Sequence, residues 1–74
     1  MIRVNLTKVM FERQISSKDL AEKVGITQAN LSNLKNGKVK GIRFHTLEKI
    51  CSNLSCQPGD ILEYLPDHST DGSD

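Results

Sequence analysis

Uncharged polar side chains dominate one short stretch of this 74-residue chain, from residue 27 to residue 36. Amides and hydroxyls surround two leucines there, Leu31 and Leu34, whose spacing predicts a helix with one buried edge. Gln and Asn each carry a donor and an acceptor in one plane, and this geometry matches adenine N6 and N7 in the major groove of DNA. The stretch therefore indicates a helix that reads base edges.

An alternative interpretation is a solvated helix face with no ligand. Solvated helices usually carry Glu and Lys, whereas Asn, Ser and Thr have weaker helix propensity and gain little for stability. Between Gln28 and Leu47 the chain has no acid and four cations, namely Lys35, Lys38, Lys40 and Arg43. This local excess of positive charge favours a polyanionic partner, and hence the base-reading interpretation.

The net charge of the whole chain, +1, hides an uneven distribution. All ten Lys and Arg residues precede Pro66, whereas three of the nine acids follow it, at Asp67, Asp71 and Asp74. Residues 1–66 therefore carry a net charge of +4 and are predicted to form a single domain. Residues 67–74 lack apolar side chains and are predicted to be a disordered acidic tail.

Five helical segments are expected to position the polar stretch, so the predicted fold class is all-α. The first three cover about residues 4–13, 17–24 and 28–36, the fourth covers about 44–54, and a short fifth helix begins at Pro58. The fifth helix is expected to carry Ile61, Leu62 and Leu65. Extended structure is indicated only weakly, at residues 2–4.

Local signals define the ends of these helices. Ser16 and Thr27 are the predicted N-caps of the second and third helices, since each hydroxyl can accept a backbone hydrogen bond. Gly25 suits the left-handed position that ends the second helix. The fourth helix is expected to bury one apolar face, made of Phe44, Leu47, Ile50, Cys51 and Leu54.

Cysteine usage and the lack of a targeting segment predict a cytosolic protein with reduced thiols. Two cysteines are too few for a disulfide scaffold. Cys51 and Cys56 are a candidate metal pair, but only His45 and His68 accompany them, so buried thiols are favoured. No nucleophile and base are paired, which predicts a non-enzymatic protein without cofactor or metal.

The pattern from Ile15 to Gly37 resembles the Cro/C1-type helix-turn-helix domain of phage repressors, also called the XRE family. Its characteristic positions are Leu20-Ala21, Val24-Gly25-Ile26-Thr27-Gln28, Leu31-Ser32, Leu34 and Asn36-Gly37. Residues 44–51 and 56–62 resemble the last two helices of that domain. The resemblance covers about residues 3–65 and is to small stand-alone bacterial or phage transcriptional regulators.

This resemblance implies a lambda-repressor-like five-helix bundle whose third helix enters the major groove. The residues that it assigns to base edges are Thr27, Gln28, Ala29, Ser32 and Asn33. The residues that it assigns to phosphates are Ser16, Ser17, Asn36, Lys38, Lys40, Arg43 and Phe44, the last through its backbone N–H. Two positions depart from many relatives, which have Gln at Ser17 and a capping residue at Arg43. An uncapped helix end beside Arg43 suits a phosphate, or lets Arg43 reach a narrow minor groove.

The predicted function is sequence-specific binding of double-stranded DNA by a transcriptional regulator, a repressor that occupies a pseudo-palindromic operator as a homodimer. Half-sites would lie about 34 Å apart. Tyr64 and Leu65, near the end of the domain, are the predicted dimer surface. An alternative is a protein-interaction module, such as an antitoxin that binds a partner protein, and the acidic tail favours this second function.

Overall fold

The computed structural model describes residues 1–66 and contains five helices and two short strands. In chain order they are β1 (Ile2–Val4), α1 (Leu6–Glu12), α2 (Ser17–Val24), α3 (Gln28–Lys35), α4 (Phe44–Leu54), α5 (Pro58–Ile61) and β2 (Leu62–Tyr64). The five predicted helices are confirmed. Within this part of the chain, no helix has the length and apolar character needed to span a bilayer.

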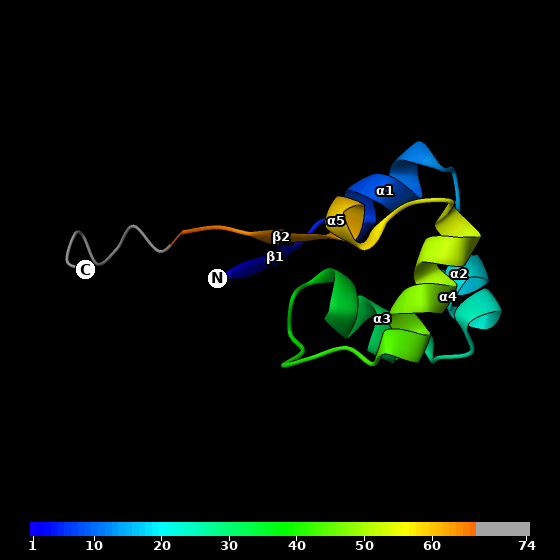
Figure 1. Ribbon diagram of the computed structural model, residues 1–74. Coiled ribbons are helices and arrows are strands. Elements are labelled where there is room, and N and C mark those ends of the chain that lie inside the picture. Colours follow the sequence, from blue (N-terminus) through cyan, green and yellow to red (C-terminus); the bar gives the residue numbers. More distant parts are fainter. Residues whose placement is uncertain (67–74) are drawn as a thin grey trace.

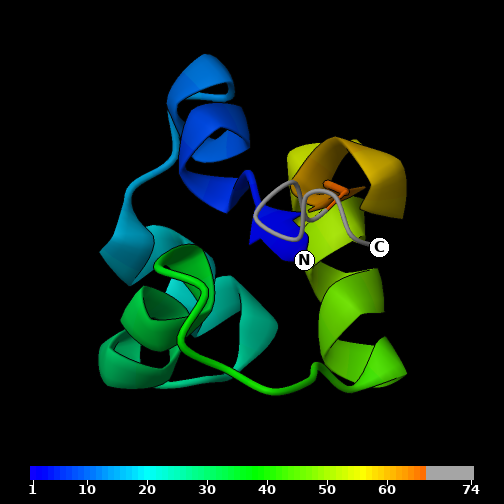
Figure 2. The same ribbon diagram turned by 90° about the vertical axis from the view of Figure 1, so that its left-hand side faces the viewer.

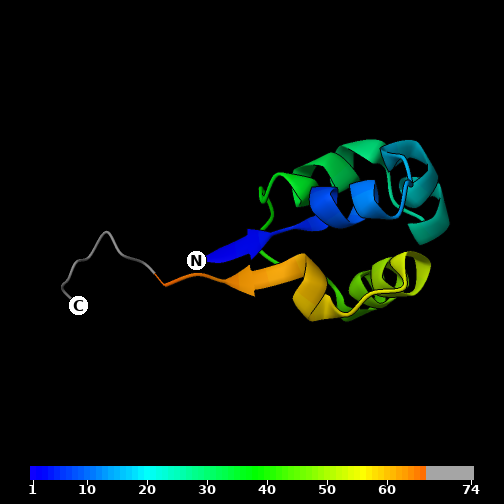
Figure 3. The same ribbon diagram turned by 90° about the horizontal axis from the view of Figure 1, so that it is seen from above.

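The helices form two sides that enclose one aliphatic core. Seen from above, α1, α2 and α3 lie on one side, and α4 and α5 lie on the other (Figure 3). α2 packs against both α3 and α4, while α1 packs against α3 and α5. Every helix contributes to the buried core, which consists of Leu6, Val9, Met10, Leu20, Ala21, Val24, Leu31, Leu34, Ile50, Leu54 and Ile61.

The helix ends follow the local signals in the sequence. Ser16 Oγ accepts a hydrogen bond from the Asp19 N–H at 3.1 Å, and Thr27 Oγ1 accepts one from the Asn30 N–H at 3.0 Å. Gly25 has a φ of 86°, and its N–H donates to the Ala21 carbonyl at 2.8 Å. These bonds confirm the predicted caps of α2 and α3, each of which stabilises its helix by about 1 kcal/mol.

A two-stranded antiparallel sheet was not predicted. β1 pairs with β2, with Ile2 opposite Tyr64 and Arg3 opposite Glu63, and the ribbon extends away from the helices (Figure 1). Leu62 therefore belongs to a strand, and the prediction that Leu62 and Leu65 lie on the fifth helix was wrong. Three-residue strands carry too short a pattern to read in sequence, and neither is stable without its partner.

Hydrogen bonds between the two ends of the domain hold this ribbon together. Glu63 Oε1 accepts from Arg3 Nη2 at 2.8 Å and from Asn5 Nδ2 at 3.1 Å. The hydrogen bond from Asn5, and then that from Arg3, lowers the pKa of the Glu63 carboxyl. The Met1 amino group donates to the Leu65 carbonyl at 2.7 Å, and the Leu65 N–H donates to the Met1 carbonyl at 2.8 Å.

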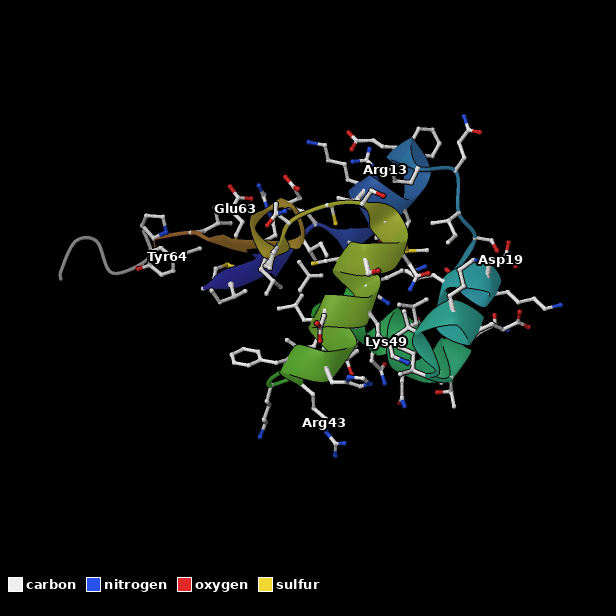
Figure 4. All side chains as sticks on the ribbon, turned by 45° about the vertical axis from the view of Figure 1, so that its right-hand side comes forward. Arg13, Asp19, Arg43, Lys49, Glu63 and Tyr64 are labelled. Atoms are coloured by element: carbon white, nitrogen blue, oxygen red, sulfur yellow. The ribbon has the colours of Figure 1, made fainter. Side chains whose placement is uncertain are left out.

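Carbonyl groups at the C-terminal end of α4 accept hydrogen bonds from the side chain of Arg13, the residue that follows α1. Arg13 Nε donates to the Leu54 carbonyl at 2.7 Å, and its Nη2 lies 3.5 Å from the Ser55 carbonyl. Figure 4 shows Arg13 where α1 ends, beside the last turn of α4. A cation at this position complements the negative end of the helix dipole and satisfies carbonyls that have no helical partner.

The apolar face of α4 differs from the prediction at its first residue. Ile50 and Leu54 are buried and Leu47 and Cys51 are half-buried, but the Phe44 side chain is 87% exposed. Phe44 begins the helix, so its side chain lies beyond the end of the core.

Candidate nucleic-acid interface

The exposed face of α3, together with its N-cap, carries all the residues predicted to read bases. Burial of Leu31 and Leu34 turns α3 so that its opposite face points to solvent. The side chains on the exposed face include Thr27, Gln28, Ala29, Ser32 and Asn33. Within residues 1–66 the amides of Gln28 and Asn33 make no hydrogen bond, so both can pair with a ligand without breaking an internal contact.

Asn30 is also exposed on α3, but it lies on the side of the helix next to the start of α4. It lines a hollow of about 420 Å³ between α3 and the start of α4, together with Ile42, Arg43 and Thr46. This position separates it from the residues assigned to base edges.

The start of α2 and the end of α3 are joined by a direct contact. Lys35 Nζ donates to Ser17 Oγ at 2.7 Å, and both side chains are half-buried. Ser17 is the first residue of α2, where unpaired N–H groups and the helix dipole favour an anion. The ammonium group of Lys35 adds a full positive charge at this point, which makes it a candidate phosphate site.

Lys35 was not among the predicted phosphate-binding residues. A signal for it exists in the sequence, because Lys35 lies four residues after the buried Leu31 and so shares the edge of α3 that packs toward α2. Its stem is half-buried for this reason, while its charged end reaches Ser17.

Asn36 ends α3 and contacts a residue of the base-reading set. Its Nδ2 lies 3.4 Å from Ser32 Oγ, which is long for a hydrogen bond between neutral groups. A phosphate or a base edge could replace this weak contact with little loss.

The basic loop after α3 follows one edge of the molecule. In Figure 2 it runs from the end of α3 along the lower edge to the start of α4. Gly37 has a φ of 71°, and the Lys38 N–H donates to the Asn33 carbonyl at 2.8 Å, so the loop is anchored to α3. The side chains of Lys38, Lys40 and Arg43 are exposed.

The N-terminus of α4 has no side-chain cap, as its sequence predicted. Arg43 occupies the N-cap position, and its side chain makes no capping hydrogen bond. It extends away from the helix bundle instead (Figure 4). The first N–H groups of α4, including that of Phe44, therefore lack a side-chain cap and form a positive helix end beside a guanidinium group.

The two cysteines lie apart from this face. Cys51 and Cys56 are half-buried rather than fully buried as predicted. Among residues 1–66, no three His, Cys, Asp or Glu side chains are grouped closely enough to hold a metal ion.

A helix that ends at a left-handed glycine, an amide-rich exposed helix and a basic loop together form a helix-turn-helix DNA-binding unit. Residues 5–67 match the Cro/C1-type HTH DNA-binding domain, and the chain belongs to this family. It is a helix-turn-helix DNA-binding transcriptional regulator and not an enzyme, as predicted.

Two individual proteins are similar over most of their length. The HTH-type transcriptional regulator YozG of Bacillus subtilis strain 168 is 56% identical over 69 residues, which cover 93% of this chain and 82% of YozG. The crystal structure of the transcriptional regulator VanUg, form II, superposes with a TM-score of 0.69 at 31% identity and covers 89% of this chain and 87% of that chain.

Proposed function

We propose that this regulator is a repressor that binds a pseudo-palindromic operator in double-stranded DNA as a homodimer. The observation that carries the proposal is the exposed, uncharged face of α3 between two positive regions. One region is the Lys35 ammonium group, which lies beside the first residue of α2, and the other is the loop that ends at Arg43.

In this proposal α3 lies in the major groove and reads sequence through Gln28 and Asn33, with Thr27, Ala29 and Ser32 at the same surface. Phosphates on either side are held by Ser16, Ser17, Asn36, Lys38, Lys40, Arg43 and the Phe44 N–H, and we add Lys35 to this set. Phosphate contacts supply affinity and orientation, while base contacts supply specificity.

The proposed dimer surface is the end of the β ribbon, around Tyr64 and Leu65. Tyr64 is 71% exposed, and Ile2, directly opposite it in the sheet, is 59% exposed. Leu65 is half-buried, and its main chain pairs with Met1. An exposed tyrosine beside aliphatic side chains is a common interface composition. Two copies would double the few base contacts that one small domain can make.

Repression follows in this proposal from occupancy of a promoter, and the site of action is the nucleoid in the bacterial cytoplasm. The alternative function, an antitoxin or other protein-interaction module, was favoured by the predicted disordered acidic tail at residues 67–74. That tail lies outside the described residues, whereas family membership supports DNA as the partner.

Selection from random DNA with the full chain tests this proposal. We expect an enriched inverted repeat that binds two copies in sedimentation, and lower transcription when the repeat is placed in a reporter promoter. Enrichment of a single half-site that binds one copy would reject the dimer, and raised transcription would reject repression. A lack of any enriched sequence would reject base reading by α3.

A further inference from the structure

Cys51 and Cys56 flank the turn that ends α4, and the backbone there brings them together. The Cys56 N–H donates to the Cys51 carbonyl at 3.1 Å, and the N–H of Ser55, which has a φ of 53°, donates to the same carbonyl. This is a Schellman-type turn, a motif in which the side chains of the two residues joined by the outer hydrogen bond are frequently in contact. The path between the two Cα atoms runs through the Cys51 carbonyl, the 3.1 Å hydrogen bond and the N–Cα bond of Cys56. Because this path is bent, the Cα atoms lie less than about 7 Å apart.

Cys51 also influences the ionisation of Cys56. The pKa of Cys56 is raised, first by partial burial and then by the neighbouring Cys51. Disulfides form where Cα atoms are about 4.4–6.8 Å apart and the side chains point toward each other. The turn places the two Cα atoms at a separation compatible with this range.

Small molecules can reach this pair. Both cysteines line an open groove of about 480 Å³ along the outer face of α4, with apolar walls that include Phe44, Leu47 and Pro58. Both side chains are half-buried, and both also pack against the edge of the core.

We propose that Cys51 and Cys56 form a modification site that a low-molecular-weight disulfide oxidises to an intramolecular disulfide. The Cys51 thiolate attacks one sulfur of the reagent, and the other half leaves as a thiolate that takes up a proton. The Cys56 thiolate then attacks the Cys51 sulfur and releases the second half. The protein loses two electrons and two protons, and the reagent is reduced to two thiols.

This order of attack follows from the environment of Cys56. Its raised pKa keeps the thiol protonated at neutral pH, which makes it a poor first nucleophile. Once Cys51 carries the mixed disulfide, the turn keeps Cys56 beside it, so the second attack is intramolecular. The inference does not depend on the proposed repressor function.

The test treats the reduced full chain with excess glutathione disulfide and measures the intact mass without reducing agent. We expect one monomeric product that is lighter by two hydrogen atoms, carries no glutathione, and returns to the starting mass with dithiothreitol. Retention of two free thiols, a stable product with glutathione attached, or a cross-linked dimer would each overturn the proposal.

Two controls separate the turn from the mere presence of two thiols. Cys51→Ser and Cys56→Ser should each accumulate one bound glutathione, because no second thiol can displace it. The reaction should be slower in Cys51→Ser, which retains only the poorer nucleophile. In concentrated urea the wild-type chain should give several-fold less closed disulfide relative to the glutathione adduct. An equal ratio in urea and in buffer would show that the folded turn does not bring the thiols together.

Discussion

Lys35 Nζ lies 2.7 Å from Ser17 Oγ, so the charged end of the last residue of α3 sits at the first residue of α2. The short side chain of Ser17 reaches less far toward a phosphate than a longer polar side chain, such as glutamine, would. Lys35 offers a cation at the same point, next to the positive end of the α2 dipole. We propose that the two positions act as one anion-binding unit.

Lys35→Met should weaken binding to all DNA sequences by a similar factor. The lysine is expected to contact a phosphate and not a base, so its loss should reduce the slope of log K against log salt by about 0.9. Titrations of a selected and a random duplex over a range of salt concentrations measure both effects. Lys8→Met is the matched control, since Lys8 lies on the α1–α5 side. The same slope for Lys35→Met and wild type would remove Lys35 from the interface.

Gln28→Ala and Asn33→Ala should weaken binding to the selected site much more than binding to random DNA. Each amide is exposed on α3, and a bidentate pair with a base discriminates by about 1–3 kcal/mol. Competition binding with the two duplexes measures this difference. Asn53→Ala, an exposed amide at the other end of α4 from Arg43, should change neither affinity. Equal losses of affinity on both duplexes would show that Gln28 and Asn33 do not read bases.

Tyr64→Glu should reduce cooperative binding to an inverted repeat while leaving binding to a half-site intact. A charge at this exposed position would oppose close contact between two apolar ribbon ends. Analytical sedimentation of the protein–DNA complex counts the bound copies. Phe11→Glu replaces another aromatic residue, 83% exposed on α1, and should leave two copies bound. Two copies bound with unchanged cooperativity in Tyr64→Glu would exclude the ribbon as the dimer surface.

Arg13→Met should lower the free energy of unfolding by about 1 kcal/mol, because the Leu54 carbonyl loses a charged donor at the negative end of α4. Chemical denaturation followed by circular dichroism measures the change. Arg13→Lys keeps the charge and should recover part of the loss. If the methionine variant unfolds at the same denaturant concentration as wild type, water satisfies these carbonyls equally well.

Acid should selectively weaken the β ribbon. The folded state lowers the pKa of Glu63, so this carboxylate stabilises the fold above its unfolded pKa and the contribution is lost as pH falls through the folded value. The difference in Tm between wild type and Glu63→Gln should therefore be largest near neutral pH and shrink below the ordinary range of glutamate. Glu22→Gln, on the exposed side of α2, serves as the charge control. A difference in Tm that persists in acid would show that the packing of Glu63, and not its charge, causes the effect.

The helices and much of the candidate interface could be predicted from the sequence because their causes are local. A capping hydroxyl such as Ser16, the glycine at position 25 and the leucine spacing in α3 act within one or two helical turns. The amides and cations that follow the turn are visible as composition, so the exposed polar face of α3 can be predicted from the sequence.

Tertiary structure alone decided the contacts between distant residues. Arg3 and Glu63 are 60 positions apart, and Arg13 and Leu54 are 41 positions apart, so no local pattern records either pair. The strand conformation of residues 62–64 depends on pairing with β1, which is why a continued helix was predicted there. Phe44 fits the apolar spacing of α4 but lies beyond the end of the core, because burial depends on which neighbours the fold supplies. Periodicity in a sequence identifies a face of a helix, whereas the packing of the whole chain determines what that face meets.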